Sequence, residues 1–331
     1  MIIGHDKAVG QFRSAWDSRA IHHAWLLSGP RGVGKATFAH AAAKRLLAEA
    51  AGPAFDLPRL DTPTDHPIAR LIAAGSHPDM RWLQRQPKEK GEGLARNISV
   101  KQVRELSELF DLSPAMSNWR VAVIDAADEL EPSAANALLK MLEEPPANSL
   151  FFLVSHAPGR LLPTIRSRCR RLEFSALPDD AMASVLEREL PETNESDRRR
   201  LIPLAGGSAG RALAFASLDL GSLESEAAAI LREGDADNSK RSALASQLGR
   251  KAAADRYSAF LELLPSLVAR QARSLDEPRR ERALEAYDRV RELVAIAPRL
   301  SLDPAATVFQ LGSILASVAE RPFLEGPRRA G

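Results

Sequence analysis

The sequence predicts an α/β domain with a parallel sheet covered on both faces, followed by a small helical domain and an all-helical C-terminal domain. Three short apolar runs carry the sheet prediction, at residues 24–28, 121–125 and 151–155. They are bounded by turn residues and alternate with helical patterns, which is typical of buried parallel strands. Beyond about residue 222 the apolar residues keep helical spacing and strand signals become rare.

Length and composition indicate several globular domains. The 331 residues exceed the roughly 250–300 that one core can fill. Composition shifts predict boundaries that divide the chain into 1–175, 176–222 and 223–331, with a frayed end at 327–331. The 45 Lys and Arg residues nearly balance the 43 Asp and Glu residues, which excludes an acidic tail protein and a histone-like polycation.

The sequence gives no sign of a membrane span or a secretory signal, so we expect a cytoplasmic protein that contacts no membrane. Cys169 is the single cysteine, which excludes an intrachain disulfide and any multi-cysteine zinc site. His66 and His77 are expected to be loop residues rather than metal ligands. No metal site is therefore predicted.

Two helices and two loops are predicted inside the α/β domain. Ser99 and Gln102 have the spacing of a capping box that opens a helix through about Phe110. A second helix follows Pro132, and its core-facing residues are Ala134, Leu138, Met141 and Leu142. The polar, glycine-containing segments 51–65 and 84–97 are predicted to be loops, the second of them mobile.

A phosphate-binding loop is the strongest motif. Residues 29–35, GPRGVGK, fit G-x-x-x-x-G-K and lie between a predicted strand and a predicted helix, the context that the motif requires. Glycines let several backbone N–H groups converge on one phosphate chain, and the helix N-terminus and a lysine add positive charge. The candidate nucleotide-binding residues are Gly29, Gly32, Gly34, Lys35 and Thr37.

Two departures from the motifs predict that turnover has been lost. Ala36 stands where a Ser or Thr would bind Mg²⁺, and Thr37 is rotated from that position by roughly 100°. Asp125 ends an apolar strand, where a carboxylate usually faces the metal, but Ala126 follows it and cannot act as a base. We expect weak ATP or ADP binding at most and no required cofactor.

Two acidic residues beyond Ala126 leave an alternative open. Asp128 or Glu129 could replace the missing base, although surface acids near a helix start are the simpler interpretation. The arginine cluster at 166–171 is also open to more than one interpretation. It could be a solvated basic surface, a patch for a phosphate backbone, or the source of an arginine that stabilises charge at a neighbour's nucleotide.

Three segments together resemble the bacterial DNA polymerase III clamp-loader family of AAA+ proteins. They are IHHAWLLSG at 21–29, AANALLKMLEEPP at 134–146 and TIRSRC at 164–169. The resemblance covers about residues 1–215 and implies a RecA-like domain, a helical lid and a helical collar. An intact Ser-Arg-Cys beside a degraded phosphate loop is similar to a noncatalytic stator subunit. Arg168 would then be offered to the ATP site of an adjacent motor subunit.

Further expectations rest on the same resemblance. Ser155 matches the sensor-1 position, whereas Arg211 is offset by one residue from the sensor-2 arginine. Many relatives carry four zinc-binding cysteines where residues 50–80 have none, so we expect no zinc. The implied partners are motor subunits of the gamma/tau type and the delta subunit, with the sliding clamp and primed DNA reached through the complex at the replisome.

Two rival functions come from other classes. An active AAA+ ATPase of the gamma/tau motor type is disfavoured by Ala36 and Ala126. A nucleotide-sensing adaptor without clamp-loader partners is disfavoured by the long helical third part and by Ser-Arg-Cys. The basic segments 198–200 and 279–282 are interpreted as solvated helix faces that could also meet DNA or another subunit.

Overall fold

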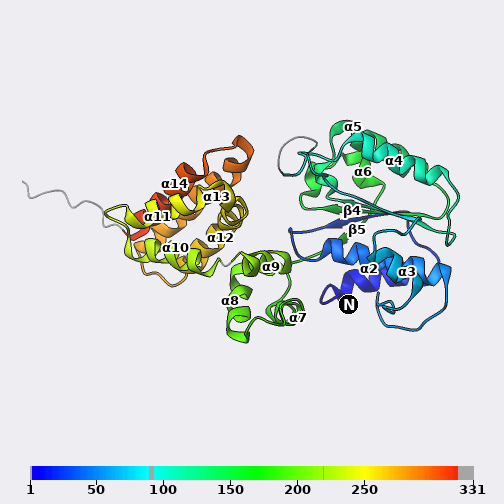
Figure 1. Cartoon of the computed structure of the whole chain (residues 1–331), viewed down its shortest axis with the longest axis horizontal. Coiled ribbons are helices and arrows are strands. Elements are labelled where there is room, and N and C mark those ends of the chain that lie inside the picture. Colours follow the sequence, from blue (N-terminus) through cyan, green and yellow to red (C-terminus); the bar gives the residue numbers. More distant parts are fainter. Residues whose placement is uncertain (1, 89–92, 219, 320–331) are drawn as a thin grey trace, which may run out of the picture. The chain divides into compact units, whose positions relative to one another are not determined.

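The computed structural model describes residues 2–88, 93–218 and 220–319. The chain divides into two compact units (Figure 1). The first unit is Met1–Val185 with Gly207–Gly210, and the second is Leu186–Gly206 with Arg211–Gly331. The predicted division at 176 and 223 stays a prediction. No helix among the described residues is long and apolar enough to cross a membrane.

A five-stranded parallel sheet forms the centre of the first unit. Its order is β2-β3-β4-β1-β5. The strands are β1 (Ala24–Ser28), β2 (Met80–Leu83), β3 (Arg120–Asp125), β4 (Ser149–Ser155) and β5 (Arg170–Glu173). All strands begin at one edge, here called the amino edge, and end at the opposite carboxyl edge, because every neighbouring pair is parallel.

Helices cover both faces of this sheet (Figure 1). On one face lie α1 (Asp6–Asp17), α2 (Lys35–Ala51) and α3 (Pro67–Ala73), and on the other lie α4 (Val100–Asp111), α5 (Pro132–Glu143) and α6 (Pro163–Ser167). Two 3-10 turns, η1 (Ala127–Glu129) and η2 (Pro158–Arg160), follow β3 and β4. Helix α7 (Asp179–Glu189) comes after β5.

Alternation along the strands divides the apolar residues between two cores, one on each face. Phe152 points to the first core, where its ring lies 5.5 Å from that of Phe12. The preceding Phe151 points to the second core and stacks on Phe110 at 5.0 Å. Both faces of the inner strands are therefore dry, which explains why those strands read as continuous apolar runs.

The three predicted strands are confirmed as β1, β3 and β4, but two further strands were missed. Both missed strands are edges of the sheet, β2 and β5. In β5 only Leu172 is buried, while Arg170, Arg171 and Glu173 are exposed. An edge strand tolerates charged side chains, so its sequence resembles a basic surface segment rather than a buried strand.

The predicted helix starts are confirmed by their contacts. Gln102 N donates to Ser99 Oγ at 3.4 Å and Ser99 N donates to Gln102 Oε1 at 3.1 Å, which is the reciprocal capping box. Helix α5 buries its four predicted core residues. In segment 84–97, Pro87 and Leu94 form an antiparallel bridge, and the mobility of the segment stays a prediction. Residues 89–92 of that segment lie outside the described residues.

Helices and the loops between them make up the second unit, and no strand occurs among its described residues. Its helices are α8 (Glu195–Ala205), α10 (Gly221–Glu233), α11 (Ser239–Leu248), α12 (Ala254–Ala272), α13 (Arg279–Leu300), α14 (Pro304–Ala319) and the 3-10 turn η3 (Lys251–Ala253). Helix α9 (Ala209–Ser217) begins in segment 207–210 and continues into this unit. Its core centres on the buried face of α12, with Phe260, Leu264 and Leu267. The predicted frayed end at 327–331 lies outside the described residues.

Candidate functional site

The predicted phosphate loop connects β1 to α2, at the carboxyl edge of the sheet. Gly29 has a φ of 152°, and a Cβ there would lie 2.0 Å from the carbonyl oxygen of Phe174. Gly34 caps the first turn of α2 with a φ of 106°. Side chains are thus excluded at both ends of the loop, by a close backbone approach at one end and by a left-handed turn at the other.

The loop is held from its carbonyl side. Each carbonyl oxygen from residue 29 to residue 33 accepts a hydrogen bond from a fixed donor. The donors are Lys35 Nζ to residue 29 (2.7 Å) and to residue 30, Ser208 Oγ to residue 31 (3.0 Å), Gly210 N to residue 32 (2.9 Å) and His5 Nε2 to residue 33 (2.7 Å). A loop fixed in this way keeps its curl, and its N–H groups remain for an anion.

Segment 207–210 therefore has a role that the sequence did not reveal. The glycine cluster was compared only with a sensor-2 helix start, yet Ser208 and Gly210 both bind the phosphate loop directly. A Cβ on Gly210 would lie 3.0 Å from Gly32 Cα, so a side chain at this position would press against the phosphate loop. Arg211, the next residue, belongs to the second unit, as does Glu262, whose Oε2 lies 3.7 Å from Arg211 Nε.

Lys35 is buried inside the loop that it binds. The residue is 2% exposed, and burial lowers the pKa of its ammonium to about 8. The carboxylates of Asp128 and Asp125 act in the opposite direction, but they do not offset the loss of water. A phosphate bound in the loop would stabilise this buried ammonium, because its negative charge would compensate for the lost water.

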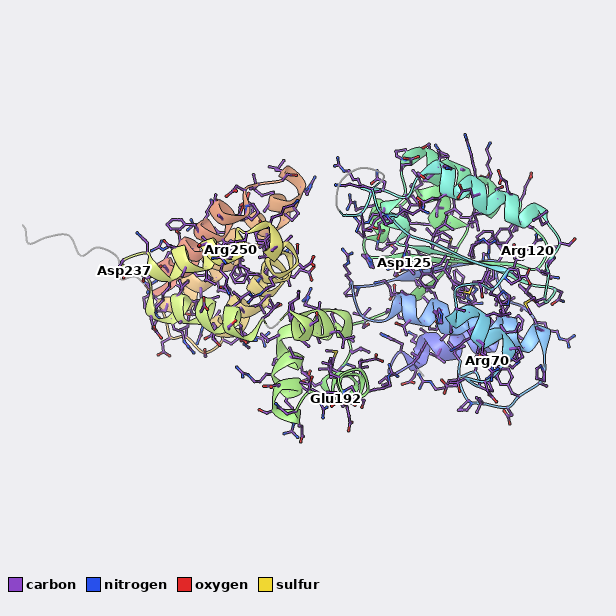
Figure 2. The ribbon with its side chains drawn as sticks, in the orientation of Figure 1. Arg70, Arg120, Asp125, Glu192, Asp237 and Arg250 are labelled. Atoms are coloured by element: carbon purple, nitrogen blue, oxygen red, sulfur yellow. The ribbon has the colours of Figure 1, made fainter. Side chains whose placement is uncertain are left out.

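Asp125 lies at the carboxyl edge, at the end of β3. Figure 2 shows it at the opposite end of the sheet from Arg120, which begins the same strand. Burial, and then the nearby Glu129, raise the pKa of the Asp125 carboxyl. It lines a cavity of about 210 Å³ together with Arg31, Ala126 and His156. Ala126, the residue after Asp125, thus presents a methyl group to this cavity, where an active ATPase would have a carboxylate base.

Asp128 is not the solvated surface acid that the sequence suggested. Its Oδ1 accepts from Ser155 Oγ at 2.6 Å, and its Oδ2 accepts from the backbone N–H groups of His156 at 2.5 Å and Ala157 at 3.3 Å. The carboxylate therefore fixes the end of β4, including the buried Ser155 at the predicted sensor-1 position. These three hydrogen bonds give Asp128 a structural role at the end of β4.

The other candidate base, Glu129, is also engaged. Its Oε2 lies 2.8 Å from Arg85 Nε, from the segment that follows β2. Thr37 lies exposed on α2, and Ala36 before it is half-buried. The expectation that Thr37 is turned away from a metal position stays a prediction. Among the described residues, the two candidate bases named by the sequence, Asp128 and Glu129, are thus both bound to other groups of the protein.

Arg168 lies at the amino edge of the sheet, whereas the phosphate loop lies at the opposite, carboxyl edge. It follows α6 and comes just before β5, whose first residue, Arg170, pairs in register with Trp25 near the start of β1. The phosphate loop begins only after β1 ends, roughly 10 Å further along the strands at about 3.3 Å per residue. The side chain of Arg168 is 35% exposed.

Two contacts hold the Arg168 guanidinium. Nη2 lies 2.8 Å from Glu143 Oε1 at the end of α5, and Nη1 donates to the carbonyl oxygen of Thr164 at 3.0 Å. The neighbouring arginines are occupied otherwise. Arg170 lies over the Trp25 ring at 5.1 Å, and Arg171 Nε donates to Ser28 Oγ at 2.9 Å. Arg166, Arg170 and Arg171 are nevertheless exposed, so a solvated basic surface stays open as an interpretation of the cluster.

The residues examined as metal ligands have local structural roles. His66 accepts a hydrogen bond from Ile68 N at 3.2 Å and caps α3, and His77 accepts from Asp79 N at 3.1 Å. Burial raises the pKa of the Cys169 thiol to about 12. Within 2–88, 93–218 and 220–319, no group of three His, Cys, Asp or Glu residues is placed to hold a metal ion. The absence of zinc stays a prediction.

A phosphate loop at the carboxyl edge of a parallel five-stranded sheet, followed by helical segments, defines a RecA-like AAA+ module with a helix-rich C-terminal region. The sequence model of the family described as "DNA polymerase III, delta subunit" matches residues 4–178. The chain belongs to this family.

Individual relatives agree with that assignment. The chain is 38% identical over 197 residues to "DNA polymerase III subunit delta'" of Pseudomonas aeruginosa, an alignment that covers 57% of this chain and 55% of that protein. It is 34% identical over 200 residues to the protein of the same name in Escherichia coli, covering 59% of this chain and 54% of the relative. The aligned segment thus spans little more than half of either relative.

Two comparisons extend over nearly the whole chain. "DNA polymerase III subunit tau" of Salmonella typhimurium is 28% identical over 323 residues, which is 97% of this chain and 46% of that protein. The solved structure of a DNA polymerase III gamma subunit-related protein from Thermotoga maritima is 16% identical, covering 95% of this chain and 100% of that chain, with a TM-score of 0.47.

Proposed function

We propose that the chain is a noncatalytic stator subunit of a DNA polymerase III clamp loader. In this role it supplies Arg168 to the ATP site of a neighbouring motor subunit and helps the loader place the sliding clamp on primed DNA. The proposal includes motor subunits of the gamma/tau type and the delta subunit as partners, and a place at the replisome. Family membership and the delta-prime relatives support the clamp-loader role.

The position of Arg168 is the observation that carries the finer proposal. The chain's own phosphate loop is at the carboxyl edge of the sheet, whereas Arg168 is at the amino edge. A side chain at the amino edge does not reach its own phosphate loop, so any nucleotide that it serves belongs to another chain. A guanidinium suits this role because it remains charged and presents a rigid fork of donors.

The phosphate loop of this chain supports a structural rather than catalytic role. Ala126 lines the cavity beside Asp125, Asp128 is bound to the end of β4, and Glu129 is paired with Arg85. The loop itself is fixed by Lys35, His5 and segment 207–210. We infer that the loop joins the sheet to the start of α9 and binds ATP or ADP weakly, with no required cofactor and no zinc.

The test is a loader reconstituted with Arg168→Ala in place of the wild-type chain. The loader is expected to assemble normally, but its DNA- and clamp-stimulated ATP hydrolysis and its clamp loading are expected to fall, because transition-state charge at one motor site loses its partner. Unchanged clamp loading would show that Arg168 does not serve a neighbouring site.

A further inference from the structure

The carboxylate that binds Arg168 is the feature from which a new residue role follows. Glu143 is the last residue of α5, and its Oε1 lies 2.8 Å from Arg168 Nη2. Its side chain is 43% exposed and that of Arg168 is 35% exposed, so the pair is at the surface with one side open to solvent. A contact of this kind either orients the arginine toward an incoming anion or competes with that anion.

Both ends of the ion pair rest on rigid backbone. Ile165 of α6 and Leu142 of α5 are buried in the same core, on one face of the sheet. The helix ends that carry Arg168 and Glu143 are therefore fixed relative to each other. A salt bridge between anchored backbones restricts the rotamers of the arginine side chain before another partner arrives.

The hydrogen-bonding capacity of the guanidinium favours orientation over competition. Arginine has five N–H donors. Glu143 and the carbonyl oxygen of Thr164 each bind one terminal nitrogen, which leaves further N–H groups of the fork for another acceptor. Arg168 can thus meet an anion without first leaving Glu143.

The relative strength of the two interactions points the same way. An exposed ion pair contributes little to stability, because water screens it. A phosphate at an interface that excludes water attracts a guanidinium more strongly, through charge-assisted and often bidentate hydrogen bonds. Glu143 is therefore too weak a partner to hold Arg168 back, but strong enough to bias its orientation beforehand.

We propose that Glu143 is the positioning residue of Arg168, holding the guanidinium together with the Thr164 carbonyl so that its remaining donors face a phosphate of another subunit. This inference rests on the proposed function of Arg168. It adds a residue that acts through the arginine and does not itself touch nucleotide.

The experiment uses the complete reconstituted loader with Glu143→Ala, Glu143→Gln, or the control Glu144→Ala, which changes the exposed neighbouring glutamate. Clamp loading and the kcat and KM for stimulated ATP hydrolysis are measured with ATP, clamp and primed DNA. Glu143→Ala is expected to lower kcat and clamp loading by about two- to fivefold with KM unchanged, which corresponds to the strength of an exposed ion pair. Glu143→Gln retains an oxygen acceptor and is expected to recover most of the activity, and the control is expected to match wild type.

A second set of variants separates positioning from a structural effect. In the Arg168→Ala background, Glu143→Ala is expected to cause no further loss, because its target is gone. An equal loss in that background, or an unchanged or faster rate for Glu143→Ala alone, would overturn the positioning role. If Arg168→Ala itself loads clamps normally, then the proposed function fails, and that result is distinct from a failure confined to Glu143.

Discussion

The burial of Lys35 predicts how the free energy of unfolding depends on pH, in both sign and size. The ammonium is 2% exposed, and its pKa is lowered from 10.5 to about 8, mainly by burial. Between those two values the unfolded chain binds a proton that the folded chain has released. The free energy of unfolding therefore rises with pH across this window, since stability increases wherever the unfolded state holds more protons.

The magnitude follows from the two pKa values. The Lys35 contribution to the free energy of unfolding is expected to rise by roughly 2 kcal/mol between pH 7 and pH 9.5. Lys35→Met removes this contribution while it keeps an unbranched side chain of similar length. The free energy of unfolding of wild type, minus that of the variant, is thus expected to increase by roughly 2 kcal/mol from pH 7 to pH 9.5.

Urea unfolding followed by tryptophan fluorescence measures the difference. All four tryptophans lie between residues 16 and 119, so the signal reports on the first unit. Nucleotide and phosphate are left out of the buffer, because an anion on the loop would raise the pKa of Lys35. A difference that stays constant with pH, or that shifts in favour of the variant, would refute the buried-ammonium interpretation.

Two further predictions concern the groups around Asp125. Asp128→Asn places an amide N–H₂ or a single carbonyl oxygen where two backbone N–H groups and the Ser155 hydroxyl now find acceptors. The free energy of unfolding of the variant, measured by urea titration, is expected to be lower than that of wild type by about 1–3 kcal/mol. A decrease below about 0.5 kcal/mol would contradict the view that Asp128 stabilises the end of β4. The purified wild-type chain, with Mg²⁺ and primed DNA, is expected to show the same background ATP turnover as Lys35→Ala, because Ala126 provides no base. Turnover that Lys35→Ala abolishes would instead favour the motor-type ATPase.

The sequence predicted the interior of the fold better than its edges. The inner strands β1, β3 and β4 are buried on both faces, so their continuous apolar runs predicted strands without any tertiary information. The edge strands β2 and β5 have one solvated side, and in β5 the charges of Arg170 and Arg171 concealed the single buried Leu172. A buried inner strand imposes its pattern on the sequence, whereas an edge strand does so only weakly.

The site divides in the same way between local and tertiary features. The motifs at residues 29–35 and at Asp125 are set by spacing along the chain, and they lie between β1 and α2 and at the end of β3, whereas their roles toward a nucleotide stay a prediction. The contact of Ser208 with the phosphate loop joins residues 177 positions apart, and that of Asp128 with Ser155 joins residues 27 apart. No motif encodes these pairings, because they depend on which segments the fold brings together.

The most direct test of the central claim compares two arginines of the same short segment in the assembled loader. Arg168→Ala is compared with Arg166→Ala, which removes an equal charge at an exposed position of α6 only two residues away. Assembly is checked by size, and clamp loading is measured on primed DNA with ATP. The account predicts that both loaders assemble and that only Arg168→Ala loses clamp loading, by at least tenfold, given that an arginine supplied in this way can be worth about 10³–10⁵ in rate. Equal loading by the two variants would contradict it.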